Sequence, residues 1–412
     1  MPPGPGTRNF ITYDMGGTST DVCLVRDLTP VMTSDSMVGA FPVKVPQIDM
    51  HTVGAGGGSI AWLDSGGILK VGPHSAGADP GPIAYGLGGD RVTVSDANFL
   101  LGRIPAEYFL GGEMKLDLER ARRIVQEQLA KPLNITVEEA CAAVVEVANA
   151  NMLKMLRVVT VEKGCDPADF AIVAFGGNGA VHGIELAADL GVREVIVPPA
   201  PGLLSAQGLL VADIRYDFRQ THVEAVLGGD IGSVERVFVE LERRGREALQ
   251  LYGLADSGIT FQRSADMRYR RQAYEINMRL PDRELTPADQ PEIAEAFHQL
   301  HERMYGRRDT AGLIQFVTLS VTAVGNTRRL EHKPLEQGDG TAKKARKPAH
   351  KVYFRDHGMI ECACYDRTLL LAEDMVAGPA LIEAADSTTV VPPGWTVCCD
   401  RIGNLMITRK GE

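Results

Sequence analysis

The sequence predicts a protein of the α/β class, with an additional α+β region and a β-rich C-terminal domain. Two stretches carry this prediction. Residues 10–25 are predicted to form two strands joined by a tight turn at Gly16 and Gly17. Residues 171–197 are predicted to form a strand, a glycine-rich turn, a helix and a second strand. This order favours a parallel sheet covered by helices.

The first glycine turn has the composition of an anion-binding site. A Gly16-Gly17 turn exposes backbone N–H groups that can face an anion. Hydroxyl donors follow directly, namely those of Thr18, Ser19 and Thr20. Asp14 and Asp21 flank the turn, and because carboxylates repel a bare phosphate, they indicate a divalent cation or water in between. The turn is a candidate phosphate hairpin for a magnesium nucleotide, and an ordinary polar hairpin turn is the alternative.

The second glycine turn comprises Gly176, Gly177, Asn178 and Gly179, between a predicted buried strand and a predicted helix. A turn of this kind commonly places a nucleotide at the helix N-terminus. It is not a Walker A loop, because no Gly-Lys-Ser or Gly-Lys-Thr follows, and its glycine spacing is not that of a dinucleotide-binding loop. His182, near the start of the helix, is either a ligand contact or a packed polar residue.

Length and composition set the class of protein. The 412 residues are too many for one compact core, so we expect two or three domains. The net charge of -10 argues against nucleic acid or an anionic membrane as the main partner. The apolar runs are too short to span a bilayer, and the N-terminus lacks a signal-peptide pattern. Seven cysteines, an odd number, do not indicate a disulfide scaffold, and we expect a cytoplasmic protein.

Periodicity predicts the remaining elements in order. Helices are predicted over residues 94–101, 116–129, 140–158, 178–190, 234–251 and 291–305, with Ser95 and Thr136 as candidate caps. Short strands with Pro and Gly turns are predicted over residues 352–409. The predicted domains are a nucleotide-binding lobe at residues 1–215, an α+β domain at 216–335, a linker at 336–349 and a β-rich domain at 350–412.

Further candidate ligands lie between the two glycine turns. Asp49 and His51 are two residues apart in a predicted strand and so point to the same face, and His74 and Asp79 follow. Two histidines and two aspartates could ligate a divalent metal, and structural hydrogen bonds around glycine-rich loops are the alternative. The glycine-rich run at residues 54–58 indicates a close approach of backbone to a ligand.

The motif DMGGTSTDV at residues 14–22, followed by AFGGNGAVH at residues 174–182, resembles the hydantoinase A/5-oxoprolinase family. Further blocks extend the resemblance over nearly the whole chain, at residues 48–62, 71–82, 93–104, 198–210, 265–276 and 377–395. This family belongs to the actin, Hsp70 and sugar-kinase superfamily. The resemblance therefore implies an actin-like (ribonuclease H-like) ATP-binding lobe that contains both glycine turns.

One departure from the family pattern concerns the N-terminus. Full-length members of the resembled family begin with another glycine hairpin, of the type DxGGTxTD, in a separate N-terminal lobe. Here residues 1–8 are a short lead rich in Pro and Gly, and the chain opens on the second such hairpin. We therefore expect that another chain supplies the first lobe, or that this chain is a fragment.

The resemblance implies ATP-dependent hydrolysis of a cyclic amide (hydantoin, N-methylhydantoin or 5-oxoproline) through phosphorylation of the amide oxygen. It implies that the first turn holds phosphate, that Asp14 or Asp21 orients Mg²⁺ through water, and that the second turn backs the nucleotide. The candidates for the substrate side are Asp49, His51 and Asp79. The candidates for a directly bound metal are Asp14, Asp49 and His51.

The resemblance also implies partners. Many members of the family require a B-type subunit for the hydrolytic step, so we expect such a subunit and an oligomeric complex. Two other interpretations stay open. One is a subunit of an ATP-dependent ketone carboxylase, which the same family contains, and the other is an inactive split or truncated lobe that binds a partner.

Overall fold

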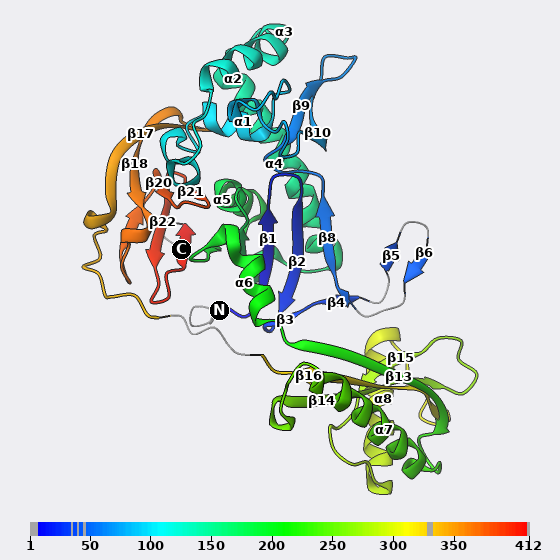
Figure 1. Ribbon diagram of the computed structural model, residues 1–412. Coiled ribbons are helices and arrows are strands. Elements are labelled where there is room, and N and C mark those ends of the chain that lie inside the picture. The colour runs from blue at the N-terminus through cyan, green and yellow to red at the C-terminus, as the bar shows by residue number, and fades with distance from the viewer. Residues whose placement is uncertain (1–6, 34–35, 39–40, 44–46, 328–332, 410–412) are drawn as a thin grey trace. The chain divides into compact units, whose positions relative to one another are not determined.

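The computed structural model of the chain describes residues 7–33, 36–38, 41–43, 47–327 and 333–409. The chain forms two compact units (Figure 1). One unit combines Met1–Gln207 with His332–Glu412, and the other is Gly208–Glu331. The predicted α/β class with a β-rich C-terminal region is confirmed. Residues 1–6 of the predicted lead lie outside the described residues.

A nine-stranded sheet forms the centre of the first unit. Its order is β19-β22-β23-β12-β11-β1-β2-β3, and β8 also pairs with β2. Because β1 pairs in parallel with β11 and antiparallel with β2, the predicted hairpin and the predicted strand–helix–strand unit meet at β1. The strands are β1 Phe10–Met15, β2 Thr20–Arg26, β3 Thr29–Pro30, β8 Met50–Val53, β11 Ala171–Phe175, β12 Glu194–Val197, β19 Met375–Ala377, β22 Trp395–Cys399 and β23 Leu405–Arg409.

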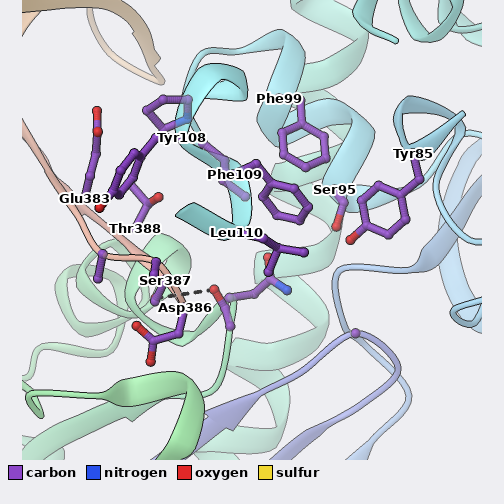
Figure 2. Close-up of a pocket in the computed structure, with 17 residues that line it drawn as sticks. Tyr85, Ser95, Phe99, Tyr108, Phe109, Leu110, Glu383, Asp386, Ser387 and Thr388 are labelled. Atoms are coloured by element: carbon purple, nitrogen blue, oxygen red, sulfur yellow. Dashed lines mark hydrogen bonds between the residues drawn. The ribbon is translucent and has the colours of Figure 1, made fainter. Parts of the chain in front are cut away.

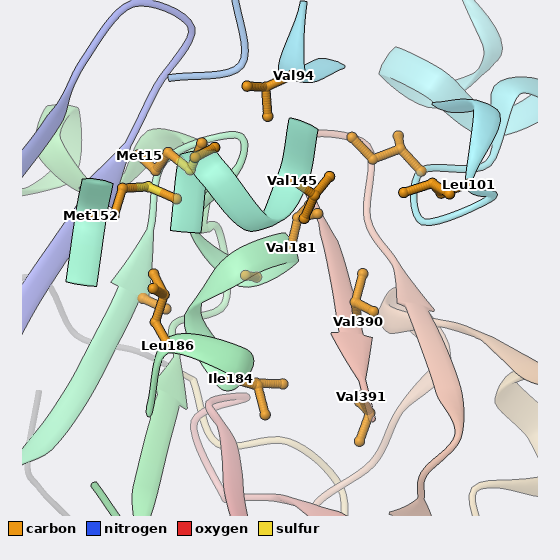
Figure 3. Close-up of a cluster of buried hydrophobic side chains, with 14 of the residues drawn as sticks. Met15, Val94, Leu101, Val145, Met152, Val181, Ile184, Leu186, Val390 and Val391 are labelled. Atoms are coloured by element: carbon orange, nitrogen blue, oxygen red, sulfur yellow. The ribbon is translucent and has the colours of Figure 1, made fainter. Parts of the chain in front are cut away.

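One face of the hairpin β1–β2 packs against helix α4 (Val137–Val159). The alternation of β1 buries Ile11, Tyr13 and Met15 on this face. The hydroxyl of Tyr13 lies 2.8 Å from the sulfur of Met152 on α4, and Figure 3 shows Met15 and Met152 in the same apolar cluster. The opposite face of β1 is left for Asp14, which is only partly buried.

Two helix starts show how capping residues fix the ends of the helices. α4 begins after Thr136, which forms a capping box with Glu139, so the predicted cap is confirmed. α1 (Val94–Leu100) begins after Thr93, and a capping box joins Thr93 to Asp96. The prediction of Ser95 as the cap of this helix is therefore wrong, and the Ser95 hydroxyl is left without that role.

The remaining elements of the first unit lie around this sheet (Figure 1). The helices are α2 Leu118–Val125, α3 Lys131–Leu133, α5 Gly179–Leu190 and, at the boundary to the second unit, α6 Leu204–Val211. Short two-stranded pairs are β4 Met32–Thr33 with β7 Gln47–Ile48, β5 Ser36–Val38 with β6 Phe41–Val43, and β9 Ser59–Leu63 with β10 Leu69–Ser75.

The C-terminal residues complete the first unit. A four-stranded sheet has the order β17 Arg346–Phe354, β18 Gly358–Asp366, β20 Ala380–Glu383 and β21 Thr388–Val391. Val390 and Val391 of β21 belong to the same core as Ile184 of α5 (Figure 3). β22 and β23 extend the central sheet beyond β12. β17 begins at Arg346, inside the segment predicted as a linker, because its first residues already pair with β18.

The second unit is a four-stranded antiparallel sheet with two helices. The strand order is β13-β16-β14-β15, and Phe238, Phe297 and Phe316 fill its core. The elements are β13 Ile214–Ala225, α7 Ile231–Gln250, β14 Ile259–Tyr269, β15 Ile276–Arg279, α8 Gln290–Tyr305 and β16 Ile314–Gly325. In the part of the chain that the structure describes, no helix is both long enough and apolar enough to cross a bilayer.

Candidate functional site

The turn between β1 and β2 presents unpaired hydrogen-bond donors. Gly16 N–H donates to the carbonyl oxygen of Ser19 at 3.1 Å and closes the turn. Among the described residues, the backbone N–H groups of Gly17, Thr18 and Ser19 find no partner, and neither do the hydroxyls of Thr18 and Ser19. Gly17 and Thr18 are exposed. A turn with this many free donors is suited to bind the oxygens of an anion.

The glycine-rich run at residues 54–58 supports this turn from behind. Gly57 N–H donates to the carbonyl of Gly16 at 3.0 Å, and Gly58 N–H donates to that of Gly17 at 2.5 Å. A Cβ atom on Gly56 would lie 2.8 Å from the backbone of Gly17. The approach of one backbone to another thus explains Gly56 and Gly58, and the predicted approach of this run to a ligand stays a prediction.

The second glycine turn lies directly beside the first. Gly176 has a φ of +79°, and a Cβ atom there would overlap with Asp14 and Met15, so the position requires glycine. Asn178 N–H donates to the carbonyl of Met15 at 3.0 Å, and its side-chain amide donates to the carbonyl of Gly16 at 3.3 Å. The two turns that the sequence predicted as phosphate and nucleotide contacts are therefore brought together.

Two carboxylates lie at the base of the hairpin turn. Asp14 and Asp21 are directly opposite each other in the register of β1 and β2. Asp14 Oδ2 accepts a hydrogen bond from Ser205 Oγ of α6 at 2.9 Å, and Asp21 Oδ1 accepts one from Thr52 Oγ1 at 2.5 Å. Partial burial raises the pKa of Asp14; the hydrogen bond from Ser205 lowers this pKa, and the Asp21 carboxylate raises it.

A cavity of about 190 Å³ opens beside both turns (Figure 2). Gly17 lines it from the first turn, and Gly177 and Asn178 line it from the second. Much of its wall is aromatic, made by Tyr85, Phe99, Tyr108 and Phe109. Phe109 holds the group together, because its ring centroid lies 5.1 Å from that of Phe99 and 5.6 Å from that of Tyr85.

The loop between β20 and β21 completes the cavity, and sequence reasoning did not assign it a role. Asp386 Oδ2 accepts a hydrogen bond from Gly202 N–H at 2.8 Å, and Ser387 Oγ donates to the carbonyl of Gly177 at 3.4 Å. These residues lie inside the block 377–395 that carries the family resemblance, which was the available signal. No local pattern joins them to a glycine turn some 200 positions away, as the separation of 210 between Ser387 and Gly177 shows.

Asp49 lies between β7 and β8 and not in the predicted strand, but its Oδ1 is 3.2 Å from His51 Nε2. No described contact joins either residue to Asp14. Lys163 donates to the Asp49 carboxylate and to His51 Nε2, the latter at 3.2 Å. Thr52 pairs with Asp21 and His51 with Val22, so the side chain of His51 points away from the face that carries Asp14 and Asp21.

The predicted direct metal site is not assembled among the described residues. No group of three His, Cys, Asp or Glu side chains there is arranged to hold a metal ion. Asp79 is exposed, with no hydrogen bond in the described structure, and it does not line the cavity. The roles assigned to Asp49, His51 and Asp79 on the substrate side stay predictions.

Two other predicted contacts point into the core. The hydroxyl of Thr20 is buried and donates to the carbonyl of Ala55 at 2.6 Å, so it does not belong to the free donors of the turn. His182 is buried, with Nδ1 2.7 Å from Asn149 Oδ1 and Nε2 3.0 Å from the Asn98 amide. Burial, followed by the nearby Arg103 charge, lowers the pKa of His182 well below its usual value. The packed alternative for His182 fits this position.

The fold and these contacts define an α/β protein with an anion-binding hairpin turn beside an aromatic cavity. Comparison with known proteins adds its family. The profile of the Hydantoinase/oxoprolinase family matches residues 4–218, and that of the Hydantoinase/oxoprolinase C-terminal domain matches residues 227–407. The chain belongs to the hydantoinase/oxoprolinase family.

Individual relatives agree with this assignment. The chain is 37% identical over 414 residues to an uncharacterized protein of Methanocaldococcus jannaschii, covering 98% of this chain and 59% of the relative. It is 34% identical over 411 residues to the caprolactamase subunit alpha of Pseudomonas jessenii, covering 98% and 58%. A nucleotide-free structure of acetone carboxylase, solved to explain ATP-dependent acetone carboxylation, matches with a TM-score of 0.86 and 28% identity, covering 98% and 59%. The chain thus spans less than two thirds of each relative.

Proposed function

We propose that this chain binds ATP, with the phosphate groups at the hairpin turn Gly16–Ser19 and the nucleoside in the adjacent cavity. The observation that carries the proposal is the set of unpaired donors on Gly17, Thr18 and Ser19. Each phosphate oxygen that accepts from such a donor makes a charge-assisted hydrogen bond, which is stronger than a neutral one. Membership of a family with an ATP-dependent relative supports the choice of nucleotide.

The carboxylates at the base of the turn suit a hydrated magnesium ion. Asp14 Oδ1 and Asp21 Oδ2 accept no hydrogen bond from any described residue, so each carboxylate keeps an oxygen for the water shell of a cation. Mg²⁺ retains several waters when it binds beside phosphates, and it supplies neutralisation of their charge. Asp14 and Asp21 would hold it in this way.

The cavity is suited to the nucleoside. Its volume of about 190 Å³ accommodates a ring system and is below the usual volume of a site for a whole drug-sized ligand. Aromatic walls favour a planar ring, since stacked or tilted contacts with Phe99 and Phe109 replace water on its surface. The phosphates then extend from the cavity past Gly17, which belongs to both the cavity and the turn.

The reaction that we propose is ATP-dependent hydrolysis of a cyclic amide. The amide oxygen attacks the terminal phosphorus, the bond from that phosphorus to ADP breaks, and the amide carbon becomes electrophilic. One water adds to this carbon and the ring C–N bond breaks, which gives the amine and an acyl phosphate. A second water then hydrolyses the acyl phosphate to a carboxylate and inorganic phosphate. The residues of this chain contribute by positioning the nucleotide and by neutralising charge at the turn. Similarity to a caprolactamase subunit alpha supports this substrate class.

A second candidate is a role as a subunit of an ATP-dependent ketone carboxylase. The high structural similarity to acetone carboxylase supports it equally. A panel of hydantoin, 5-oxoproline, caprolactam and small ketones, assayed for ADP release with and without bicarbonate, separates the two reactions. Release that needs a lactam but no bicarbonate supports hydrolysis. Release that needs both a ketone and bicarbonate overturns it in favour of carboxylation.

Partner chains form part of the proposal. The caprolactamase relative is named as an alpha subunit, so its enzyme has further subunits. We propose a B-type subunit as the partner of this chain. The substrate panel is therefore run with the chain in the assembly in which it is purified from its own cells.

Calorimetric titration of the chain with Mg-ATP tests the nucleotide site. A Cβ atom on Gly17 would meet no atom within 4 Å, and Gly17 does not require a positive φ, so both Gly17→Asp and Gly17→Asn fit the fold. We expect micromolar binding that is lost in Gly17→Asp, because a carboxylate would face the phosphates, and largely kept in the isosteric Gly17→Asn. Equal affinity of the two variants, or no binding by the unmodified chain, would overturn the proposal.

A further inference from the structure

Two hydroxyl groups in the cavity wall have no hydrogen-bond partner. Ser95 is 5% exposed, and its Oγ makes no hydrogen bond with any described residue. This follows from the start of α1, where Thr93 and Asp96 form the cap. The hydroxyl of partly buried Tyr85 is likewise unpaired among the described residues. Neither oxygen is fully enclosed by protein atoms, so both hydroxyls are accessible from the cavity that their residues line and are free to bond to a ligand there.

Both hydroxyls are held firmly in place. Ser95 N–H donates to the carbonyl of Gly57 at 2.7 Å, and this anchors the first turn of α1 beside the hairpin. The Tyr85 ring lies 5.6 Å from that of Phe109 and 6.4 Å from that of Phe99. Burial, with the nearby Asp96 carboxylate as the lesser cause, raises the pKa of Tyr85, so its O–H stays protonated and able to donate at neutral pH.

This end of the cavity is a cluster of donors. Figure 2 shows the hydroxyl ends of Ser95 and Tyr85 turned to the same side of the cavity. Gly17, whose backbone N–H is also free, lines the same cavity. The Asp96 carboxylate near Tyr85 does not compete, because its oxygens already accept from Ile83 N–H, Ala84 N–H and Thr93. Two further carboxylates line the cavity and also have partners: Glu383 pairs with Lys347, and Asp386 accepts from Gly202 N–H. Donors without acceptors favour an anionic oxygen.

We propose that Ser95 and Tyr85 bind the α-phosphate of the nucleotide. The inference rests on the proposed function, and it assigns two contacts that neither the glycine motifs nor the family resemblance indicated. The base occupies the aromatic wall around Phe99 and Phe109, and the outer phosphates reach the free donors of Thr18 and Ser19 outside the cavity. The phosphate next to the ribose therefore passes the end of the cavity where Ser95, Tyr85 and Gly17 lie.

Two conservative variants isolate these contacts. Ser95→Ala and Tyr85→Phe each remove only an oxygen that bonds to no described residue, so the fold is kept and thermal unfolding of the variants verifies it. The matched controls lie outside the site. Ser320→Ala removes a serine hydroxyl that is buried and without a partner, and Tyr353→Phe removes another tyrosine hydroxyl without a described hydrogen bond.

The measurement is calorimetric titration of the chain and each variant with AMP, Mg-ADP and Mg-ATP. We expect Ser95→Ala and Tyr85→Phe each to lower the affinity for all three nucleotides by about tenfold, which corresponds to the loss of one charge-assisted hydrogen bond. The controls bind as the unmodified chain does. Unchanged affinities in both variants, or a loss confined to ADP and ATP, would overturn the α-phosphate assignment while leaving the nucleotide site intact. Absence of nucleotide binding by the unmodified chain would overturn both.

Discussion

The side-chain amide of Asn178 donates a hydrogen bond to the carbonyl oxygen of Gly16 at 3.3 Å, across a sequence separation of 162. The same carbonyl accepts a second hydrogen bond, from Gly57 N–H at 3.0 Å. One backbone oxygen thus joins the hairpin turn, the glycine-rich run and the turn before α5. The free donors of the hairpin can stay unpaired because this oxygen and its neighbours fix the turn from behind.

This arrangement predicts a strong effect of Gly57→Ala. A Cβ atom there would lie 2.6 Å from Asn178 Nδ2 and from Ser95 Oγ, so the Asn178–Gly16 hydrogen bond must give way. We expect the free energy of unfolding to fall by about 1–3 kcal/mol, the usual cost of overpacking, and Mg-ATP affinity to fall with it. Urea unfolding and calorimetry measure the two effects. Gly17→Ala, which meets no atom within 4 Å, is the control, and equal stability of both variants would contradict the explanation.

A second prediction concerns the pH dependence of Asp14. Its pKa is raised in the folded chain, first by desolvation, so the folded state holds the proton more tightly than the unfolded state does. The stabilising contribution of the proton is complete below the ordinary value of 3.8 and is lost as the pH rises through the raised pKa. Asp14→Asn should therefore be more stable than the unmodified chain at pH 7, and this gain should vanish in acid.

The same variant should lose function while it gains stability. Asn can still accept the hydrogen bond from Ser205, but it offers no negative charge to a hydrated cation. We expect Mg-ATP affinity to fall by about tenfold or more, the value of one lost charge-assisted contact. Thermal unfolding from pH 3 to pH 8 and calorimetry at pH 7 provide the two readouts. A variant that is less stable than the unmodified chain at pH 7 would refute the assigned cause of the pKa shift.

A third prediction separates the two faces of the hairpin. His51 and Lys163 lie on the face opposite Asp14, and their contact is partly exposed, with side-chain exposures of 31% for His51 and 35% for Lys163. Exposed pairs of this kind contribute about 0.2–1 kcal/mol. We expect His51→Gln to lower stability within that range and to leave Mg-ATP affinity unchanged. Loss of Mg-ATP affinity in His51→Gln, measured beside Asp14→Asn, would instead support the predicted role of His51 as a metal ligand.

Local features of the fold could be predicted from the sequence, because neighbouring residues determine them. The hairpin at Gly16, the helix after Thr136 and the helix after Asn178 each follow from residues a few positions apart. The same kind of local pattern led to the wrong prediction of Ser95 as a cap, since serine is a common residue at a helix start. The helix instead begins after Thr93, which forms a capping box with the buried Asp96. Asp96 also accepts a hydrogen bond from Ala84 N–H at 2.8 Å, a contact outside the helix.

The site could be predicted only in part, for the same reason. Sequence reasoning found both glycine turns, and the structure brings them together. The glycine-rich run at residues 54–58 was predicted to approach a ligand, and the structure shows a contact that the pattern does not reveal, because Gly56 and Gly58 make room for the backbone of Gly17. Asp14 and His51 were also predicted to bind the same metal. The alternation of side chains along one strand does not show whether a residue of another strand points to the same face of the sheet. The register of β2 with β8 supplies that information.

The last prediction concerns the second unit, where the Arg263 side chain is only 4% exposed. It donates two hydrogen bonds to Glu235, at 2.8 and 3.0 Å, and one to Glu242 at 2.6 Å. Removal of the guanidinium leaves two largely buried carboxylates without their partner, so we expect Arg263→Met to lower the free energy of unfolding by about 3–5 kcal/mol. Urea unfolding of the whole chain, monitored with a separate spectroscopic probe in each unit, measures the decrease in the free energy of unfolding.

The matched control for this prediction is Arg279→Met, which removes an arginine from the neighbouring strand β15. Arg279 is 58% exposed and pairs with Asp282 three positions away, so its loss should cost less than about 1 kcal/mol. Because Arg263 lies far from the glycine turns in the sequence and in a different compact unit, Mg-ATP binding by the folded variant should persist. Equal costs for the two substitutions would show that burial of the Arg263 pair does not determine the stability of this unit.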